Sequence, residues 1–415
     1  MSAHFGVLAF ADELAADPSL LAAWARSFDG GDAATLIIYA PDTSEQDMLA
    51  ALSGPLVDAG LEADGTADVL ALPIPASAEG EVELCRMASA VLTRREPADI
   101  FSFLPRLAPE DDLRAAASHP VATPERRHGL AVCSIVCEEG RYLREFVEFH
   151  RIVGVEHFYL YDNGSTDDTR DVLAPYIEEE VVTYIDFPHP VAQVAAYNHC
   201  ARSFGRLCEW IAFMDADEFF FAPGGGDLRE ALREFEDYGA VHVNYANYGT
   251  SGHETPPDEP IISAYTWRGR HDAVVPYPHL LKGPGLDRAD LASYHALDAH
   301  ITSVVRPERV LECKSPHHWT FRDGWYGVTE NHERHFGPWT KTVSMKKLRF
   351  NHYWTKSVED CRRKFERGRA STTKTRAWPH DFLERNAVLN DVEDHEILVH
   401  LPALRAALDR VPATT

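Results

Sequence analysis

The sequence predicts an α/β protein built from two successive units, each a mostly parallel sheet flanked by helices. Short apolar segments alternate with amphipathic segments from Phe5 to Phe221, which is the pattern of repeated strand and helix units. A chain of 415 residues is also longer than one compact core usually organises. A polar stretch at 121–128, near Pro120 and Pro124, interrupts the alternation and predicts the boundary between the units.

Residues 1–124 are expected to form a small, Rossmann-like α/β domain. The predicted strands are 5–10, 35–39 and 69–73, and the predicted helices are 20–28, 48–56 and 81–93. No glycine-rich phosphate-binding loop follows these strands, so the sequence indicates no cofactor for this domain. A scaffold or an interaction module is therefore the favoured role.

Residues 125–370 are expected to form the main domain, and residues 371–415 a helical tail. The predicted strands are 130–137, 157–161, 181–187 and 210–214, and the predicted helices are 141–153, one from Thr169, and 191–204. The helix at 141–153 ends at Gly154, a residue type that often closes helices in the left-handed conformation. Its apolar stripe consists of Leu143, Phe146, Val147 and Phe149.

The composition excludes several classes of partner. A formal net charge of -25 argues against nucleic acid or an anionic membrane as the partner of most of the surface. The local exception is 341–376, which holds twelve Lys or Arg and three Asp or Glu. Such a segment would attract a diphosphate, although a solvated basic face is the commoner explanation.

The seven cysteines are odd in number and show no CxxC pair, so they indicate no disulfide framework. No run approaches the roughly 20 apolar residues that a bilayer span requires, and Asp12 and Glu13 interrupt the apolar patch near the N-terminus. We therefore expect a cytoplasmic protein without a transmembrane segment. The sequence leaves open whether the chain forms a homo-oligomer.

An acidic pair, Asp215 and Asp217, closes the apolar run that begins at Trp210. In an extended chain alternate side chains point the same way, about 6 to 7 Å apart, so both carboxylates could face one cation. Oxygen ligands favour magnesium or manganese over zinc. The alternative is that the pair and Glu218 only solvate a turn, but the apolar flanks on both sides disfavour it.

Polar clusters follow three of the predicted strands directly: Glu138 with Glu139, Asp162 with Asn163, and Asp215 with Asp217. The carboxyl ends of parallel strands form the ligand crevice of open sheets, so the clusters are expected to converge. Taken alone, residues 162–165 would be an ordinary Asx turn. Beyond residue 224, interleaved glycine, proline and aromatic residues are explained equally well by a sugar-binding surface and by a loop-rich subdomain.

Further motifs occur in a fixed order between about residues 130 and 370. They are 141–143 with Glu145, 154–159, 161–167, Gln193 with 196–200, 210–213, 249–253, 317–318 and 348–357. Together with the acidic pair, this series resembles glycosyltransferases of the GT-A fold, specifically the group around glycosyltransferase family 92 and its bacterial relatives. Several motifs in one order are more specific than any single motif.

The resemblance implies a hexosyltransferase that moves a sugar, with inversion, from a nucleotide diphosphate sugar to a hydroxyl group. The donor would be UDP- or GDP-linked, and the acceptor a glycan or a small molecule. Asp215, Asp217 and His352 would hold Mn²⁺ or Mg²⁺, and an imidazole among carboxylates favours manganese. A packed histidine beside Tyr353 is the alternative for His352.

The resemblance also implies a set of donor-binding residues. Asp162 and Asn163 would contact the base and ribose, and Lys356, Arg363 and Arg367 would neutralise the leaving diphosphate. Arg363 and Arg367 share a helix face at i and i+4, after a capping-box start at Ser357. The full set is Glu139, Asp162, Asn163, Gln193, Asn198, Asp215, Ser251, Lys356, Arg363 and Arg367.

Direct displacement needs a general base for the acceptor hydroxyl. Glu254 is the first choice, and the competing residues are His253, His317, His318 and Asp323. Where relatives commonly have Lys-Asn-Glu after the first strand, this chain has residues 137–139 as Cys-Glu-Glu, which puts the usual donor preference in doubt.

Two other functions compete with glycosyl transfer. A nucleotidyltransferase acting on a sugar phosphate uses a similar sheet and acidic pair, but it normally has a glycine-rich nucleotide loop near the first strand, which this chain lacks. A non-catalytic sugar-binding protein would not need Asp215, Asp217 and His352 intact. An assay of donor hydrolysis with manganese would separate these functions.

Overall fold

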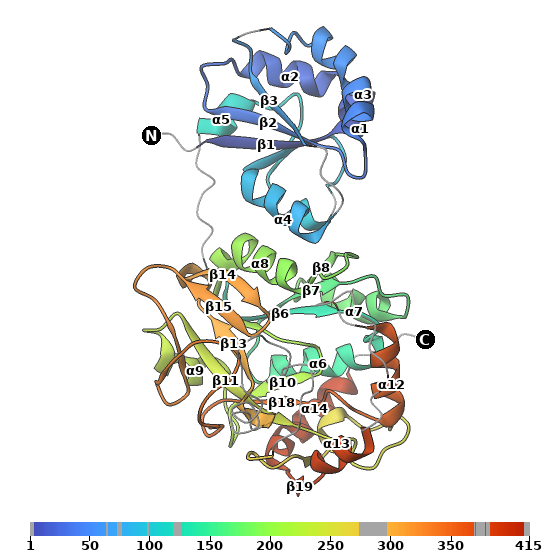
Figure 1. The fold of residues 1–415 in the computed structure, drawn as a ribbon, viewed down its shortest axis with the longest axis vertical. Helices are drawn as coiled ribbons and strands as arrows, with labels where there is room; N and C mark the ends of the chain where they lie inside the picture. The colour runs from blue at the N-terminus through green and yellow to red at the C-terminus, as the bar shows by residue number, and fades with distance from the viewer. Residues whose placement is uncertain are drawn as a thin grey trace, which may run out of the picture. The chain divides into compact units, whose positions relative to one another are not determined.

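A computed structural model describes residues 4–63, 65–72, 77–97, 99–118, 126–273, 297–368, 370, 378 and 382–410. The chain divides into two compact units, one of residues 1–124 with 185–199 and one of residues 125–184 with 200–415. Both are α/β, as predicted (Figure 1). The predicted boundary at Pro120 and Pro124, and the start of the predicted tail at 371–377, lie outside the described residues.

The first unit contains a five-stranded parallel sheet in the order β3-β2-β1-β4-β5. Its strands are β1 (Phe5–Phe10), β2 (Ala34–Tyr39), β3 (Asp68–Leu72), β4 (Ala90–Leu92) and β5 (Arg106–Leu107). Its helices are α1 (Ala11–Ala16), α2 (Ser19–Ser27), α3 (Glu45–Asp58), α4 (Ala78–Met87) and α5 (Leu113–Ser118). The predicted helix at 81–93 is wrong in its second half, because the apolar residues of β4 pair with the central strand β1.

The second unit is organised by a 10-stranded mixed sheet, whose main path runs β10-β18-β11-β13-β9-β6-β7-β8. These strands are β6 (His128–Val136), β7 (His157–Asp162), β8 (Val182–Asp186), β9 (Cys208–Phe213), β10 (Glu218–Phe221), β11 (Ala240–Asn247), β13 (Ile301–Val305) and β18 (Arg349–His352). Of the additional strands, β16 (Gly327–Thr329) pairs with β11, and β17 (Arg334–His335) pairs with β16. The strand and helix alternation indicates the parallel part, β9-β6-β7, whereas β13 and β10 pair antiparallel with their neighbours.

Helices flank this sheet, as Figure 1 shows. They include α6 (Gly140–Ile152), α7 (Thr169–Glu178), α8 (Gln193–Ser203), α9 (Leu228–Leu232), α10 (Ile261–Ala264), α12 (Val358–Arg367), α13 (Phe382–Val388) and α14 (Leu401–Leu408). Smaller two-stranded sheets join β12 (Trp267–Arg268) to β19 (Val392–Glu393) and β14 (Val310–Ser315) to β15 (His318–Phe321). The predicted apolar stripe of α6 is confirmed, because all of its residues are fully buried.

The pairing of β10 with β18 joins two segments that lie far apart in the sequence. Phe220 lies opposite Phe350, and their rings stack with centroids 4.5 Å apart. The same register places Glu218 opposite His352. Because aromatic cross-strand pairs stabilise a ladder, this apolar contact fixes the late strand beside the acidic turn.

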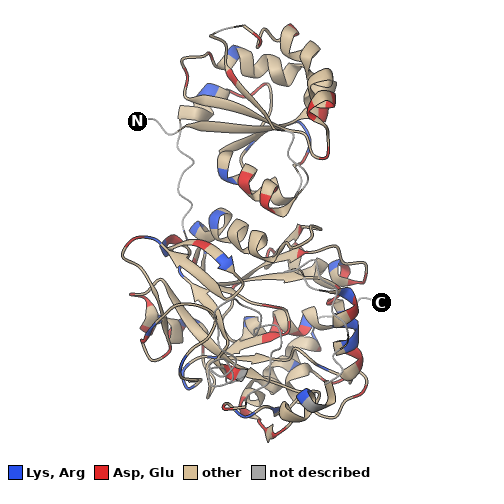
Figure 2. Cartoon of the chain, in the orientation of Figure 1, with Lys and Arg blue, Asp and Glu red and all other residues tan. Residues whose placement is uncertain are grey.

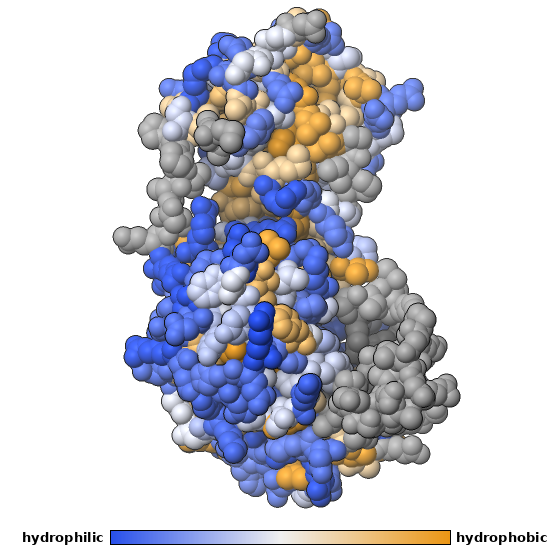
Figure 3. Space-filling model, turned by 60° about the vertical axis from the view of Figure 1, so that its left-hand side comes forward, coloured by the Kyte–Doolittle hydropathy of each residue, from blue (hydrophilic) through white to orange (hydrophobic). Residues whose placement is uncertain are grey.

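Both basic and acidic residues occur along many of the helices and strands (Figure 2). Lys, Arg, Asp and Glu alternate along α12 (Figure 2). The face of the second unit in Figure 3 is largely hydrophilic, with single apolar residues between the polar ones. This distribution accords with the strongly acidic composition of the chain.

Gly154 closes α6 in a conformation and a space that favour glycine. Its φ is +106°, its amide donates to the carbonyl of Arg151 at 3.2 Å, and an added Cβ would lie 2.3 Å from Oδ1 of Asp227. Substitution Gly154→Ala should therefore lower the free energy of unfolding by more than the roughly 1–2 kcal/mol of left-handed strain alone. Gly324→Ala is the matched control, because its φ is +87° but its added Cβ would meet no atom within 4 Å. Equal losses in urea unfolding would contradict the steric account.

Candidate active site

The acidic pair lies in a tight turn between β9 and β10. The amide of Glu218 donates to the carbonyl of Asp215 at 3.1 Å, and residues 216–217 form the turn. The expectation that Asp215 and Asp217 alternate along an extended strand is therefore wrong. The chain reverses here because β10 pairs with β18 instead of continuing β9. As a result, Asp217 is directed inward and only 2% exposed, while Asp215 is half-buried.

Asp217 faces a histidine and a lysine side chain that come from late in the sequence. Its Oδ1 lies 3.6 Å from Nε2 of His352, and its Oδ2 accepts a hydrogen bond from the ammonium of Lys364. Burial would raise the pKa of Asp217, but Lys364, His352 and Lys356 outweigh it and hold that pKa below its usual range. Asp217 Oδ1 has no hydrogen-bond partner within the described ranges.

The structure thus brings together two of the three predicted metal ligands, Asp217 and His352. Within the described part of the chain, no group of three or more His, Cys, Asp or Glu side chains is placed to hold a metal ion. The Lys364 ammonium lies where a cation would neutralise Asp217. The donor set of carboxylate and imidazole nevertheless fits a divalent cation, because a buried carboxylate oxygen is left without a hydrogen bond.

Glu218, the residue after the pair, is a buried member of the site. It is 1% exposed and accepts hydrogen bonds from Tyr245 Oη at 2.6 Å and from Thr302 Oγ1 at 3.1 Å. Burial and the neighbouring Asp215 carboxylate raise the pKa of Glu218 well above its usual range. The turn therefore places an acid that favours its neutral form beside an ionised Asp217.

A second ion cluster surrounds Glu139, at the end of β6. Its carboxylate accepts from Lys356 Nζ at 3.0 Å and from Arg367 at 2.6 Å. Burial would raise the pKa of Glu139, but these two cations outweigh it and lower that pKa. Asp217 and Lys364 also act on this pKa, so the two ion clusters are electrostatic neighbours.

Helix α12 supplies the positive charge of both clusters. Ser357 and Asp360 form the predicted capping box at its start, and Gly368 follows its end. Lys356 precedes the cap, and Lys364 and Arg367 lie on the helix, whereas Arg363 is 63% exposed and pairs with Glu359. The structure therefore does not bring Arg363 to Asp217 or Glu139.

Lys364 is not among the residues predicted from the sequence, although the phase of the helix indicates it. Cys361 and Phe365 are buried and mark the inward face of α12 at i and i+4. At 100° per residue, Arg363 points opposite this face, while Lys364 lies at its edge. The phase of the two apolar residues thus distinguishes the two cations.

The ends of β6 and β7 are tied together by side-chain hydrogen bonds. Asp162 Oδ1 accepts from the amide of Ser165 at 2.8 Å, so the Asx turn is present, and its other oxygen accepts from Tyr184. Glu138 accepts from the amide of Thr166 at 2.7 Å. The amide of Asn163 donates to the carbonyl of Val136 at 2.8 Å.

Gln193 and Asn198 lie on α8, in the part of the chain that groups with residues 1–124. Both are buried, and Gln193 Nε2 donates to Tyr197 Oη on the same helix at 3.3 Å. Their predicted contacts with the donor stay predictions.

The loop that carries Ser251, His253 and Glu254 is fixed by hydrogen bonds from two helical segments. The first amides of α12 donate to the carbonyls of His253 and Glu254, at 3.1 and 3.0 Å. The amide of Ser251 donates to Asn390 Oδ1 at 2.7 Å, just after α13. Glu254 is exposed, and the imidazole Nε2 of His253 lies 3.0 Å from the carbonyl of Ala264.

His318, the third predicted catalytic residue, begins β15 and is half-buried. Burial and the charges of nearby His335 and His318 lower the pKa of His242, which places His318 in a histidine cluster beside β11. His317 Nδ1 lies 2.9 Å from the carbonyl of Ile301. His318 and Glu254 thus lie on different elements, one on β15 and the other in the loop that precedes α10.

Several predicted site residues adopt the left-handed backbone region that non-glycine residues rarely use. These are Glu138 with φ +54°, Ser251 with φ +49° and Lys356 with φ +47°. Such conformations persist when the surrounding contacts over-determine them, and they gather at functional sites. These conformations could not be predicted from residue type, because none of the three is a glycine or an asparagine.

Buried carboxylates that face cations beside the sheet form the class of site that suits an anionic ligand, and sequence comparison specifies the family. The profile of glycosyltransferase family 92 matches residues 128–385. This is more than half of the chain, so the chain belongs to glycosyltransferase family 92.

Curated relatives include plant members of the same family. A family 92 protein of Ricinus communis is 33% identical over 160 residues, covering 36% of this chain and 29% of that protein. One of Oryza sativa subsp. japonica is 30% identical over 182 residues, covering 42% and 31%. A galactan beta-1,4-galactosyltransferase of Arabidopsis thaliana is 29% identical over 106 residues, covering 23% and 20%. The chain thus matches less than a third of the length of each relative.

Solved structures show weaker similarity. TarS 1–349 of S. aureus in complex with UDP has a TM-score of 0.24 and 12% identity, over 31% of this chain and 38% of that chain. Glucosyl-3-phosphoglycerate synthase of Mycobacterium tuberculosis has a TM-score of 0.24 and 14% identity, over 53% and 65%. TM-scores this low do not define a shared overall arrangement. Among the described helices, none combines the length and apolar character that crossing a bilayer needs.

Glu145 connects α6 to α10 through hydrogen bonds, and its protonation makes the stability of the folded chain depend on pH. It lies on α6, accepts from the amides of Ile261 at 2.8 Å and Ile262 at 3.3 Å, and burial raises its pKa to about 7. Because the folded state holds this proton more tightly than the unfolded state, the contribution is complete below about pH 4.5 and is lost as pH rises through about 7. Substitution Glu145→Gln should therefore flatten the decline in stability over this range, which is at most about 1.4 kcal/mol per pH unit.

Urea unfolding of the wild type and the variant at several pH values measures this slope. Glu178→Gln, which alters an exposed carboxylate on α7, is the control and should leave the slope as in the wild type. A Glu145→Gln slope equal to that of the wild type would contradict the assignment.

Proposed function

We propose that this glycosyltransferase is metal-dependent and transfers a hexosyl group, with inversion, from a nucleotide diphosphate sugar to a hydroxyl acceptor. The observation that carries the proposal is the buried Asp217, which faces His352 and Lys364 and lies in the electrostatic neighbourhood of the Glu139 cluster. Membership of family 92 favours glycosyl transfer over the nucleotidyl transfer considered from the sequence. A cytoplasmic location stays a prediction.

We propose Asp215, Asp217 and His352 as the residues that would hold Mn²⁺ or Mg²⁺. The bound cation would supply positive charge against the diphosphate of the donor. The unsatisfied Oδ1 of Asp217 and the nearby Nε2 of His352 support this assignment. Lys364 supports it as well, because its ammonium already compensates the same carboxylate.

The cations of α12 are the proposed partners of the leaving diphosphate. Lys356 and Arg367 pair with Glu139 and Lys364 pairs with Asp217, so all three cations lie beside the buried carboxylates of the site. A preorganised set of cations stabilises the negative charge that develops on the departing group. The exposed position of Arg363 favours Lys364 for the role that the sequence assigned to Arg363.

Donor recognition is proposed for Asp162 and Asn163 at the base and ribose, and for Gln193, Asn198 and Ser251 elsewhere on the donor. The galactan beta-1,4-galactosyltransferases of Arabidopsis thaliana among the relatives favour a UDP-linked galactosyl donor as the first to test. A GDP-linked donor is the alternative. The acceptor would be a glycan or a small molecule with a free hydroxyl group.

Glu254 is the proposed general base. The oxygen of the acceptor hydroxyl would form a bond to the anomeric carbon while the bond from that carbon to the diphosphate oxygen breaks, and the hydroxyl proton would pass to Glu254. Its exposed carboxylate and the rigid attachment of its loop to α12 support this role. The imidazole of His253 has one nitrogen engaged with a backbone carbonyl.

Asp217→Ala should abolish manganese-dependent binding of uridine diphosphate, lowering affinity by at least about tenfold in calorimetry, because the buried ligand is lost. Lys364→Met should retain or strengthen manganese binding, since it removes a competing cation from the same carboxylate. The control is Asp258→Ala, whose carboxylate is fully exposed and pairs with Arg141 at the surface. Retained manganese dependence in Asp217→Ala would remove the metal assignment.

Glu254→Gln should leave the donor dissociation constant unchanged and lower turnover by about 10²–10⁴-fold, the range that general bases contribute. Glu259→Gln changes another exposed carboxylate nearby in the sequence and should keep full turnover. Both quantities are measured by calorimetry and by release of the nucleotide diphosphate. Unchanged turnover in Glu254→Gln would move the role to His253 or His318.

A further inference from the structure

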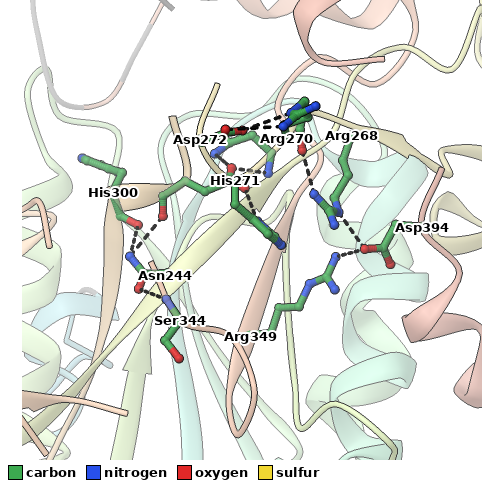
Figure 4. Close-up of polar contacts among 12 residues, drawn as sticks. Asn244, Arg268, Arg270, His271, Asp272, His300, Ser344, Arg349 and Asp394 are labelled. Carbon is green, nitrogen blue, oxygen red and sulfur yellow. Dashed lines mark hydrogen bonds and ion pairs between the residues drawn. The ribbon is translucent and has the colours of Figure 1, made fainter. Parts of the chain in front are cut away.

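A fully buried carboxylate, Asp298, is connected to His352 through one intervening side chain. Asp298 lies in η5 (Leu297–Ala299) and is 0% exposed. Its Oδ1 accepts from the backbone amide of Asn247 at 3.1 Å and from Nδ2 of Asn247 at 2.9 Å. Its Oδ2 lies 2.8 Å from Nδ1 of His271, which Figure 4 shows among the neighbouring polar side chains.

The carboxylate of Asp298 determines how the amide of Asn247 is oriented. Its Oδ1 accepts the hydrogen bond that Nδ2 of Asn247 donates, so the NH₂ group of the amide faces Asp298. The carbonyl Oδ1 of Asn247 is then directed to the other side, where it lies 3.2 Å from Nδ1 of His352. Asn247 and His352 are also direct partners in the parallel ladder of β11 and β18, which fixes their spacing.

The orientation of Asn247 determines in turn which nitrogen of His352 carries the proton. An amide oxygen only accepts, so Nδ1 of His352 must be the N–H donor in this contact. In the neutral imidazole the lone pair then lies on Nε2, which faces Asp217 Oδ1 at 3.6 Å. The ring packs against Tyr245, with centroids 4.7 Å apart, which opposes a flip.

Two acceptors therefore face one another at the centre of the site. The opposite tautomer would place an N–H of His352 toward Asp217 and satisfy that oxygen, which has no hydrogen-bond partner in the described ranges. Two facing lone pairs instead favour a cation between them. The tautomer of His352 thus decides whether this position is prepared for a metal ion.

We propose that Asp298 is a positioning residue that acts through Asn247 to hold His352 in its Nδ1–H tautomer, with the lone pair of Nε2 directed toward Asp217 Oδ1, where a divalent cation would bind. The role of the cation rests on the proposed function. The tautomer does not, because it follows from hydrogen bonds within the chain. Sequence motifs gave no indication of either residue, since they converge only through the pairing of β11 with β18 and the position of η5.

The experiment measures the protonation of the His352 ring nitrogens by ¹⁵N NMR in the full-length, metal-free protein at a pH of about 8, where imidazoles are ordinarily neutral. The signal is assigned among the 21 histidines by comparison with His352→Gln. The wild type should show a protonated Nδ1. Asn247→Leu, which removes the amide, should shift the population toward protonated Nε2 and weaken Mn²⁺ binding by about 10–100-fold in an EPR titration.

Asn244→Leu is the matched control. Asn244 is likewise a buried asparagine of β11, and Figure 4 shows it with His300 and Ser344. Its Nδ2 donates to the backbone carbonyl of Asp298 at 3.0 Å, and its Oδ1 accepts from the amide of Ser344 at 3.2 Å. A comparable loss of stability is expected in this variant, with the tautomer of His352 unchanged.

A protonated Nε2 in the metal-free wild type would overturn the proposal, and this measurement decides even if Asn247→Leu does not fold. An unchanged tautomer in Asn247→Leu, or an equal change in Asn244→Leu, would overturn it as well. If the wild type bound no Mn²⁺, the proposed metal dependence would fail by itself, because the NMR result is obtained without metal.

Discussion

The antiparallel contact between β10 and β18 is the constraint on which the rest of the site depends. One strand follows the acidic turn directly, and the other comes from more than a hundred residues later in the chain. The stacked rings of Phe220 and Phe350 hold the two strands in register. A slip of one residue would turn every side chain of the slipped strand to the opposite face of the sheet. This register delivers His352 to Asp217, and the chain that leaves β18 enters α12 with its cations.

Electrostatic balance explains why so many ionisable groups can be buried together. Asp217 and Glu139 would be costly to desolvate alone, and Lys364, Lys356 and Arg367 compensate them at short range. The turn adds Glu218, which burial and Asp215 push toward its neutral form. The arrangement therefore combines buried carboxylates with cations that compensate them at short range, which accords with the proposed diphosphate-bearing donor.

Local periodicity was sufficient to predict the parts of the fold whose partners are close in sequence. The apolar stripe of α6, its end at Gly154 and the capping box at Ser357 follow from spacing and residue type. The turn at 216–217 was missed because the apolar flanks suggested a continuous strand, whereas the partner of β10 is non-local. Lys364 and Asp298 were missed for a related reason, since their significance depends on helix phase and on strands that meet only in three dimensions.

Arg349 connects the C-terminal segment of the chain to β18, the strand that carries His352. This residue of β18 is 3% exposed and pairs with Asp394 and Glu396, and Figure 4 shows Asp394 between Arg349 and Arg268. Asn386 and Asn390 hold the backbone of the Ser251 loop from the same C-terminal segment. All four partners lie beyond residue 385, where the family profile ends. A fragment cut at that boundary would contain every predicted ligand but would leave the buried guanidinium of Arg349 without its two carboxylate partners.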